Sequence, residues 1–201
     1  MKSGEASEHR ETNERQLIIR QINPHFIFNT LATIRIITKI NADLAYDMIY
    51  DFSKYLREVF QSLTNSENIS FKEETDYITS YTNLQRIRFG NNITVHIDIE
   101  ESDFTLPPLS LQPLVENAII HGLRKGKVKG TVSIRSYKTS GEYIVEVEDD
   151  GMGFDVENNF REGGLNRVKY QFEKISGGKV EIKSDVGEGT LITLHIPENI
   201  K

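Results

Sequence analysis

Three polar residues interrupt an otherwise apolar helical segment in the middle of this 201-residue chain. They are Glu116, Asn117 and His121. On a helix, Asn117 and His121 lie one turn apart and share a face, whereas Glu116 is offset by about 100°. Such residues are common on a solvated helix face, but they also suit Mg²⁺, which favours oxygen ligands. The stripe is therefore a candidate metal site.

A second candidate is the motif Asp149-x-Gly151-x-Gly153, which follows an alternating apolar pattern typical of a strand. A carboxylate at the end of a buried strand can accept a hydrogen bond from the amino group of adenine. Gly151 and Gly153 have no Cβ, so the backbone can approach a flat ligand closely. The motif is thus a candidate for nucleotide recognition.

Two more glycine-containing segments follow, and each alone is weak evidence. Gly163 and Gly164 precede a predicted helix, so their N–H groups can face phosphate oxygens at the positive helix N-terminus. Gly187-x-Gly189-Thr190 can equally be a plain hairpin turn, as most glycine pairs are. The order of all these segments along the chain is more informative than any one of them.

Two antiparallel helices are predicted in the first third of the chain. Residues 1–16 are polar and are expected to form a linking helix. From Leu17 onward apolar residues recur at helical spacing, and Pro24 is expected to kink this helix because it lacks an N–H. A second helix follows Asn41, a predicted N-cap. Because two helices make a thin core, we expect residues 17–68 to pair with a second copy as a dimeric four-helix bundle.

The remaining residues, 69–200, are predicted to form one domain with its core at 91–197. A helix begins at Ser70, which forms an S-x-x-E capping box with Glu73, and runs towards Gly90. Further on, strands are predicted near 93–99, 131–137, 143–149, 179–183 and 190–196, and helices near 111–119 and 165–175. This pattern predicts one sheet covered by helices on one side, an α+β layer sandwich.

In order and spacing, the polar stripe and glycine motifs resemble the asparagine box and the three glycine boxes of the GHKL ATP-binding domain. Gyrase, histidine kinases and MutL share this domain, which has the Bergerat-type fold, and the similarity covers about residues 105–197. The resemblance implies that Asn117 holds Mg²⁺, Asp149 reads adenine and residues 154–162 form an ATP lid. The residues that it places around ATP are Asn117, His121, Asp149, Gly151, Gly153, Gly163, Gly164, Leu165, Gly187, Gly189 and Thr190.

The sequence departs from that family pattern at two positions. Glu162 stands where the first glycine of the second glycine box is usual, which predicts a stiffer lid hinge. Ile120 occupies a position where relatives often carry a phosphate-binding lysine. Arg124, Lys125 or His121 can supply that positive charge instead.

The sequence QINPHFIFNTL, residues 21–31, resembles the phosphoacceptor box of sensor histidine kinases of the LytS and YesM type. The segments 81–89 and 109–118 are similar to the same group, so the resemblance covers about residues 17–197. It implies an enzyme that uses ATP to phosphorylate its own histidine. The first half of the chain thus separates this family from other users of the same ATP fold.

His25 is the histidine in that box. A lone helical histidine is more often structural, but neutral imidazole is a competent nucleophile towards phosphorus and predominates near pH 7. The resemblance implies that His25 accepts the γ-phosphoryl group. Asn29, one turn later, can orient His25 or a hydrolytic water, and Glu116, next to the predicted metal ligand, is the candidate general base. The resemblance also implies a homodimer that passes the phosphoryl group to an aspartate of a response regulator. The chain would then be the cytoplasmic portion of a membrane-anchored sensor.

Composition sets limits that agree with this interpretation. The net charge of −6 argues against a nucleic-acid backbone as the main partner, and the absence of cysteine excludes disulfides and cysteine metal sites. No apolar run approaches the roughly 20 residues that span a bilayer, so the chain as given is expected to be soluble. Two alternatives remain open: a GHKL-type ATPase or serine kinase in which His25 is structural, and an inert dimeric scaffold that binds nucleotide without turnover.

Overall fold

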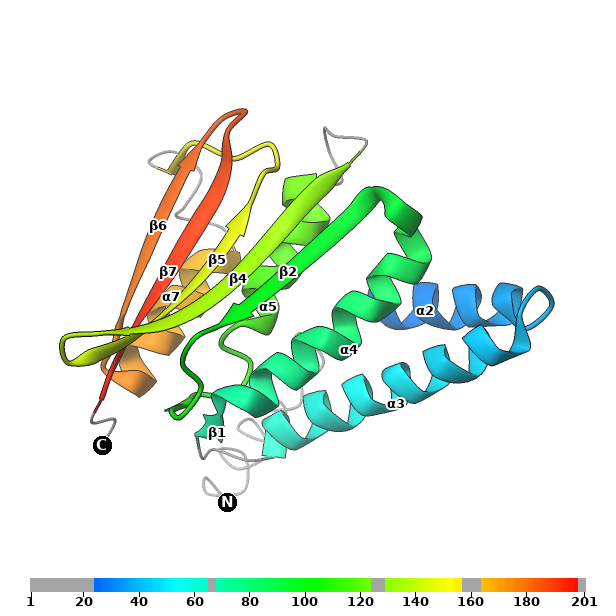
Figure 1. Ribbon diagram of the computed structural model, residues 1–201, viewed down its shortest axis with the longest axis horizontal. Helices are drawn as coiled ribbons and strands as arrows, with labels where there is room; N and C mark the ends of the chain where they lie inside the picture. Colours follow the sequence, from blue (N-terminus) through cyan, green and yellow to red (C-terminus); the bar gives the residue numbers. More distant parts are fainter. Residues whose placement is uncertain (1–23, 65–67, 124–128, 157–163, 199–201) are drawn as a thin grey trace, which may run out of the picture. The chain divides into compact units, whose positions relative to one another are not determined.

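The computed structural model describes residues 24–64, 68–123, 129–156 and 164–198, and the chain divides into two compact units, residues 1–64 and 65–201 (Figure 1). The N-terminal unit is a hairpin of two helices, α2 (Pro24–Ile37) and α3 (Ala42–Thr64). The expected linking helix over 1–16, and the helix turn before Pro24 that a kink requires, lie outside the described residues. Pro24 is the first described residue of α2.

The hairpin has the predicted N-cap and a buried apolar stripe. Asn41 Oδ1 accepts a hydrogen bond from the backbone N–H of Leu44 at 3.0 Å, which confirms its capping role. Phe26 meets Tyr55 edge to face, with ring centroids 4.8 Å apart. The buried apolar residues of the two helices are Phe26, Ile34, Ala45, Met48, Phe52, Tyr55 and Val59.

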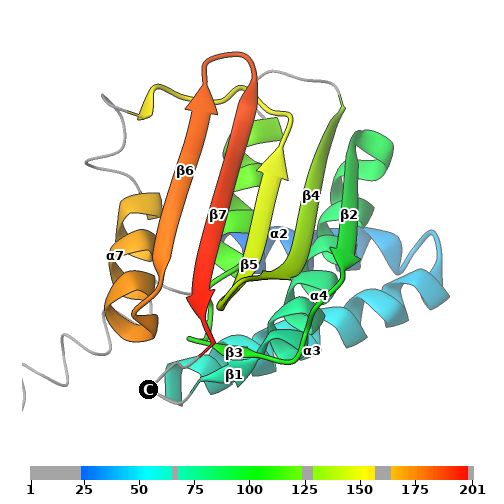
Figure 2. The same ribbon diagram turned by 60° about the vertical axis from the view of Figure 1, so that its left-hand side comes forward.

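The C-terminal unit is built on a five-stranded sheet with the order β2-β4-β5-β7-β6. Its strands are β2 (Ile93–Ile99), β4 (Gly130–Thr139), β5 (Glu142–Asp149), β6 (Lys179–Asp185) and β7 (Gly189–Pro197). All neighbours are antiparallel except β2 and β4, which are parallel. Three helices lie on one side of the sheet, α4 (Phe71–Phe89), α5 (Gln112–Asn117) and α7 (Gly164–Ser176) (Figure 2). The predicted one-sided α+β sandwich is confirmed.

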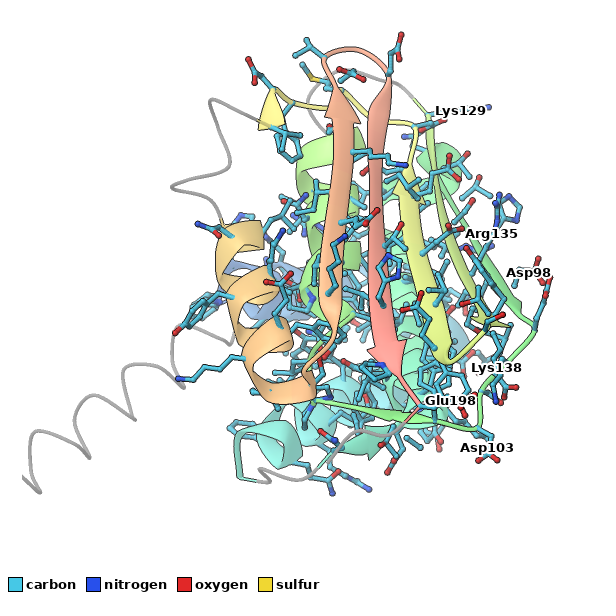
Figure 3. The ribbon with its side chains drawn as sticks, turned by 90° about the vertical axis from the view of Figure 1, so that its left-hand side faces the viewer. Asp98, Asp103, Lys129, Arg135, Lys138 and Glu198 are labelled. Carbon is cyan, nitrogen blue, oxygen red and sulfur yellow. The ribbon has the colours of Figure 1, made fainter. Side chains whose placement is uncertain are left out.

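The two faces of the sheet differ because side chains alternate along each strand. Val132, Ile134 and Ser136 of β4 point to the helices and are buried. On the opposite face, Asp98 of β2 lies beside Arg135 of β4 in the strand register, and both point away from the helices in Figure 3. The open face is mostly polar, with Ile144 of β5 buried on it opposite Tyr137 and His195, and most of the core of this unit lies between the sheet and its helices.

A second, two-stranded sheet was not predicted. It pairs β1 (Ile69–Ser70) with β3 (Thr105–Leu106) and so ties the start of α4 to the segment before α5. Phe71 stacks on Phe104, with ring centroids 4.6 Å apart, and Phe104 stacks on Tyr143 at 4.7 Å. The first helix of the unit is therefore fixed to the main sheet by aromatic packing.

Residues 90–92 form η1, a short 3-10 turn, and residues 118–123 form η2, a π-helix that continues α5. Within the part of the chain that the structure describes, no helix has both the length and the apolar character needed to cross a bilayer. Ile175 of α7 is 47% exposed. It lies in the last turn of α7, where the helix ends at Ser176.

The capping box of α4 is present as predicted. The backbone N–H of Glu73 donates to Ser70 Oγ, and Glu73 Oε2 accepts from the Ser70 backbone N–H at 2.9 Å. Hydrogen bonds from the hydroxyl and then the backbone N–H of Ser70 hold the pKa of Glu73 below its usual value. A lowered carboxyl pKa stabilises the folded state above the unfolded pKa, and this stabilisation is lost as the pH falls through the folded pKa.

Replacing Ser70 by alanine is expected to cost about 1 kcal/mol of folding free energy at pH 7, as for other N-cap losses. The cost should shrink as the pH falls below the unfolded pKa of about 4.3 and through the lowered folded pKa of Glu73, because the protonated carboxyl group no longer contributes. Urea unfolding of the full chain at pH 7 and pH 3.5 measures both values. A cost that stays constant between these pH values would show that the Glu73 carboxylate takes no part in the cap.

Candidate nucleotide-binding and phosphoacceptor sites

Asp149 is the last residue of β5, and its side chain is buried on the helix side of the sheet. Its Oδ1 accepts a hydrogen bond from the backbone N–H of Gly151 at 2.9 Å. In the strand register Asp149 lies opposite Thr190, the second residue of β7. A buried carboxylate held by its own loop in this way presents a fixed acceptor at the end of the sheet.

The loop after Asp149 packs against the turn between β6 and β7. The backbone N–H of Gly187 donates to the carbonyl of Met152 at 2.6 Å. Ser184 Oγ accepts from the backbone N–H of Phe154 at 2.9 Å and donates to the carbonyl of Gly189 at 2.9 Å. The structure therefore brings the first and third predicted glycine motifs together, although they are far apart in sequence.

Close backbone approach explains the glycines in this region. A Cβ on Gly153 would lie 1.9 Å from the carbonyl oxygen of Asp185, and a Cβ on Gly189 would lie 2.1 Å from that of Asp149. Both glycines also have positive φ angles, 57° and 96°. Gly187 has a φ of 93° but has open space around it. Gly189 thus serves strand packing as well as turn geometry, whereas Gly187 serves the turn alone.

This contrast predicts different outcomes for two alanine substitutions. Gly189→Ala should push β7 away from Asp149 and weaken ATP binding by at least about tenfold, because both backbone strain and overlap must be relieved. Gly141→Ala, in the turn between β4 and β5, carries similar strain at a φ of 93° with open space around it and is the matched control, with an expected change of about twofold or less. Isothermal titration with ATP measures both affinities. Equal losses in the two variants would contradict the role given to the Gly189 contact.

Glu116 and Asn117 are the last two residues of α5, and both are half-buried. Glu116 Oε1 accepts a hydrogen bond from Gln112 Nε2 at 2.9 Å, one helical turn earlier. Ile120 is half-buried within η2, and the backbone of His121 belongs to the same π-helix. The His121 side chain, Arg124 and Lys125 lie outside what the structure describes, as do Glu162 and most of the expected lid.

The second predicted glycine motif marks the start of α7. Gly164 is the first residue of that helix, and Leu165 beside it is buried. Gly163 lies outside the described residues. Leu165 anchors this helix start in the core, while Asn166 is half-buried.

The donor chemistry fits a magnesium ion that is shared with a nucleotide. Among the residues with described positions, no group of three or more His, Cys, Asp or Glu side chains could hold a metal ion by itself. Mg²⁺ is usually bound by one or two protein oxygens together with substrate phosphates. The side-chain oxygen of Asn117 matches that smaller requirement.

His25 lies in the first turn of α2 and is exposed. Asn29 Nδ2 lies 3.0 Å from His25 Nδ1, one turn further along the same face. Phe26, which follows His25, is buried against Tyr55. Anchoring Phe26 inward turns the imidazole outward. Asn29 contacts Nδ1, and within residues 24–64 no hydrogen bond to Nε2 is found.

Sequence reasoning missed two polar residues of the nucleotide region. Ser184 joins the two glycine loops and also lies 3.0 Å from Thr190 through their hydroxyl oxygens. Gln112 holds Glu116. The only sequence signal for Ser184 is that it continues the alternation of Val180 and Ile182 one residue beyond the predicted strand, where an apolar residue is expected. Gln112 lies four residues before Glu116, a spacing that allows side-chain contact on a helix.

Comparisons with known proteins cover both units. Residues 13–93 match the family model described as histidine kinase, and residues 109–200 match the model described as histidine kinase-, DNA gyrase B-, and HSP90-like ATPase. The chain is 35% identical over 190 residues to the uncharacterized protein YwpD of Bacillus subtilis, covering 89% of this chain and 68% of that protein. It is 37% identical over 187 residues to the sensor histidine kinase YpdA of Escherichia coli, covering 88% of this chain.

The chain spans only 33% of YpdA, and 27% of the sensor protein LytS of Staphylococcus saprophyticus, to which it is 28% identical. Among solved structures, the histidine kinase domain from the Erythrobacter litoralis blue-light activated histidine kinase superposes with a TM-score of 0.55. That match has 23% sequence identity and covers 92% of this chain and 94% of the other. At this identity the likeness describes the fold.

Proposed function

The chain belongs to the histidine kinase family, and we propose that it is a catalytic region that transfers the γ-phosphoryl group of ATP to its own His25. The observation that carries this proposal is the exposed imidazole of His25, whose Nδ1 lies 3.0 Å from Asn29 Nδ2. A structural histidine would be expected to direct its ring into the hairpin. Here the neighbouring Phe26 fills that role.

Asn29 is proposed to select the reactive form of the imidazole. An amide nitrogen on Nδ1 makes that atom an acceptor and puts the ring proton on Nε2, whereas the reversed amide accepts the proton of Nδ1. The reversed orientation leaves the electron pair of Nε2 free. We therefore propose Nε2 as the nucleophile and the Asn29 carbonyl as the group that orients the ring.

In the proposed step, Nε2 forms a bond to the γ-phosphorus while the bond from phosphorus to the bridging oxygen of ADP breaks. ADP leaves with the electron pair, and the Nδ1 proton departs from the phosphorylated ring. Glu116, which Gln112 orients, is the proposed base for that proton, directly or through one water. Most of the catalysis would come from positioning the two reactants.

The nucleotide is proposed to lie at the edge formed by Asp149, the glycine loops and α5. Asp149 would accept from the adenine amino group, and the N–H groups at Gly163 and Gly164 would face the phosphates. Asn117 would hold Mg²⁺, which neutralises phosphate charge when bound. The remaining proposed contacts with ATP come from His121, Gly151, Gly153, Leu165, Gly187, Gly189 and Thr190.

The proposed assembly is a homodimer through α2 and α3. Several large apolar side chains of these helices are exposed in the single chain, among them Phe28 at 71% and Tyr46 at 73%. Exposed apolar surface of this kind favours association. A receiver aspartate of a response regulator is the proposed recipient of the phosphoryl group. A cytoplasmic position in a membrane-anchored sensor is proposed from the sensor relatives.

Labelling with γ-labelled ATP and Mg²⁺ tests the function. We expect label that is acid-labile and base-stable, as phosphohistidine is, and that maps to the peptide containing His25. Acid-stable label would instead support a serine kinase. ATP binding without any label would support the inert nucleotide-binding scaffold.

A further inference from the structure

Glu74 of α4 lies outside the proposed ATP site, yet its side chain reaches the start of the helix that carries Glu116 and Asn117. It is completely buried, and its Oε1 accepts a hydrogen bond from the backbone N–H of Leu111 at 3.2 Å. Leu111 immediately precedes α5. We propose that Glu74 is a positioning residue that fixes α5, and through it Asn117, for Mg²⁺-dependent binding of ATP. This inference rests on the proposed function of Asn117.

The start of α5 needs an acceptor from elsewhere in the fold. The first N–H groups of a helix have no partners within it and are usually satisfied by a polar N-cap side chain. The N-cap of α5 is Leu111, which makes no side-chain cap. Glu74 accepts instead from the N–H of Leu111 itself, a donor that has no acceptor within the helix, and a carboxylate suits the positive end of a helix.

The turn before α5 is also held in an uncommon conformation. Leu109 has a φ of 58°, which places a non-glycine residue in the left-handed region. Ser110 Oγ donates to the carbonyl of Pro107 at 2.5 Å within the same turn. Such a conformation persists only where the surrounding structure enforces it. The Glu74 bond to Leu111 is a tertiary contact that does so.

A displacement at the start of α5 is expected to reach its end. The helix has only six residues, which at about 1.5 Å per residue separates its ends by about 9 Å. Gln112, the first residue of the helix, donates a hydrogen bond to Glu116. Leu114 and Val115, in the middle of the helix, are buried. The helix therefore moves as one body, and Asn117 moves with the residue that Glu74 holds.

The first test compares ATP affinity with and without Mg²⁺ in the full chain. Glu74→Met removes the acceptor at similar volume and should reduce the Mg²⁺-dependent gain in affinity by about fivefold or more, because a buried N–H loses its partner. Affinity for ATP in EDTA should change by less than about twofold, since Asp149 is untouched. Glu73→Gln, an exposed glutamate one residue away on the same helix, is the control and should leave both values unchanged.

Two further variants distinguish the length of the side chain at position 74 from its charge. Glu74→Gln keeps an acceptor oxygen at the same position and should retain the Mg²⁺-dependent gain, whereas Glu74→Asp keeps the charge on a shorter side chain and should lose it. If Glu74→Met does not fold, this pair carries the test. In an Asn117→Ala background, Glu74→Asp should have no further effect on the gain.

The opposite results would overturn the inference. One is that Glu74→Met loses ATP affinity equally with and without Mg²⁺. Another is that Glu74→Asp keeps the full Mg²⁺-dependent gain in ATP affinity. A third is that Glu74→Asp reduces this gain further in the Asn117→Ala background. All of these measurements are of binding and need no phosphorylation. A chain that binds ATP normally but labels no histidine would therefore contradict the proposed function and leave the test of Glu74 intact.

Discussion

Substituting glutamine for His25 is expected to abolish phosphorylation of the chain, leaving less than about 1% of the wild-type label, because no other side chain can take over the nucleophile. Glutamine is similar in size and can still hydrogen-bond to Asn29, so the hairpin should remain folded. ATP affinity should stay within about twofold, since His25 belongs to the N-terminal unit and the nucleotide residues to the other. Filter binding of γ-labelled product and titration with ATP measure the two quantities.

His96→Gln is the matched control for this experiment. His96 is also exposed, but it lies on the open face of β2. Its substitution should leave the labelling rate unchanged within about twofold. Label that persists in His25→Gln would show that another residue accepts the phosphoryl group and that His25 has a structural role.

The second large effect is expected from Asp149→Asn. Asparagine can still accept from the Gly151 N–H, but its amide then presents a donor where the adenine amino group also donates. Two buried donors that face each other, together with the lost carboxylate charge, should cost about 2–3 kcal/mol of binding free energy, or roughly 30- to 150-fold in ATP affinity. Titration at constant Mg²⁺ measures it, and labelling of His25 should fall with it at subsaturating ATP.

Asp150→Asn tests whether this loss is specific. Asp150 is the adjacent, exposed aspartate, and its Oδ1 accepts from the backbone N–H of Thr131 at 2.9 Å, which an amide oxygen can also do. This variant should bind ATP within about twofold of wild type. In Asp149→Asn the affinity for GTP should fall less than that for ATP, because guanine carries an oxygen where adenine carries the amino group. Equal losses for both nucleotides would argue against adenine reading by Asp149.

The sequence predicted the elements of this fold well because their signals are local. The alternation from Ile93 to Ile99, the capping box at Ser70 and the glycine at position 90 each depend on neighbouring residues. The two-residue strands β1 and β3 were missed, since residues 69–70 and 105–106 are too short to show a period. Local patterns also could not give the parallel pairing of β2 with β4, which depends on the chain crossing the sheet.

The sequence predicted which types of residue form the candidate site, but not which of them come into contact in the folded chain. Asp149 at a strand end and Gly189 in a turn carry their own signals, yet only the folded chain shows that Gly189 packs against the Asp149 carbonyl. The contribution of Glu74 was invisible, because an acidic residue after Glu73 reads as part of a solvated helix start. Likewise the π-helix at 118–123 has no signature in a sequence that suits an ordinary α-helix.

The strand order also has a consequence for the sequence of events in folding. β4 and β5 are joined by a tight turn at Ser140 and Gly141, and β6 and β7 by a turn at residues 186–188, so both hairpins can form by local closure. The pairing of β5 with β7, which joins the two hairpins, is non-local. The parallel pairing of β2 with β4 is also non-local. Asp149 and Thr190 meet only at that later stage. The nucleotide edge is thus expected to form after the hairpins themselves, so the chain would acquire its ligand site towards the end of folding.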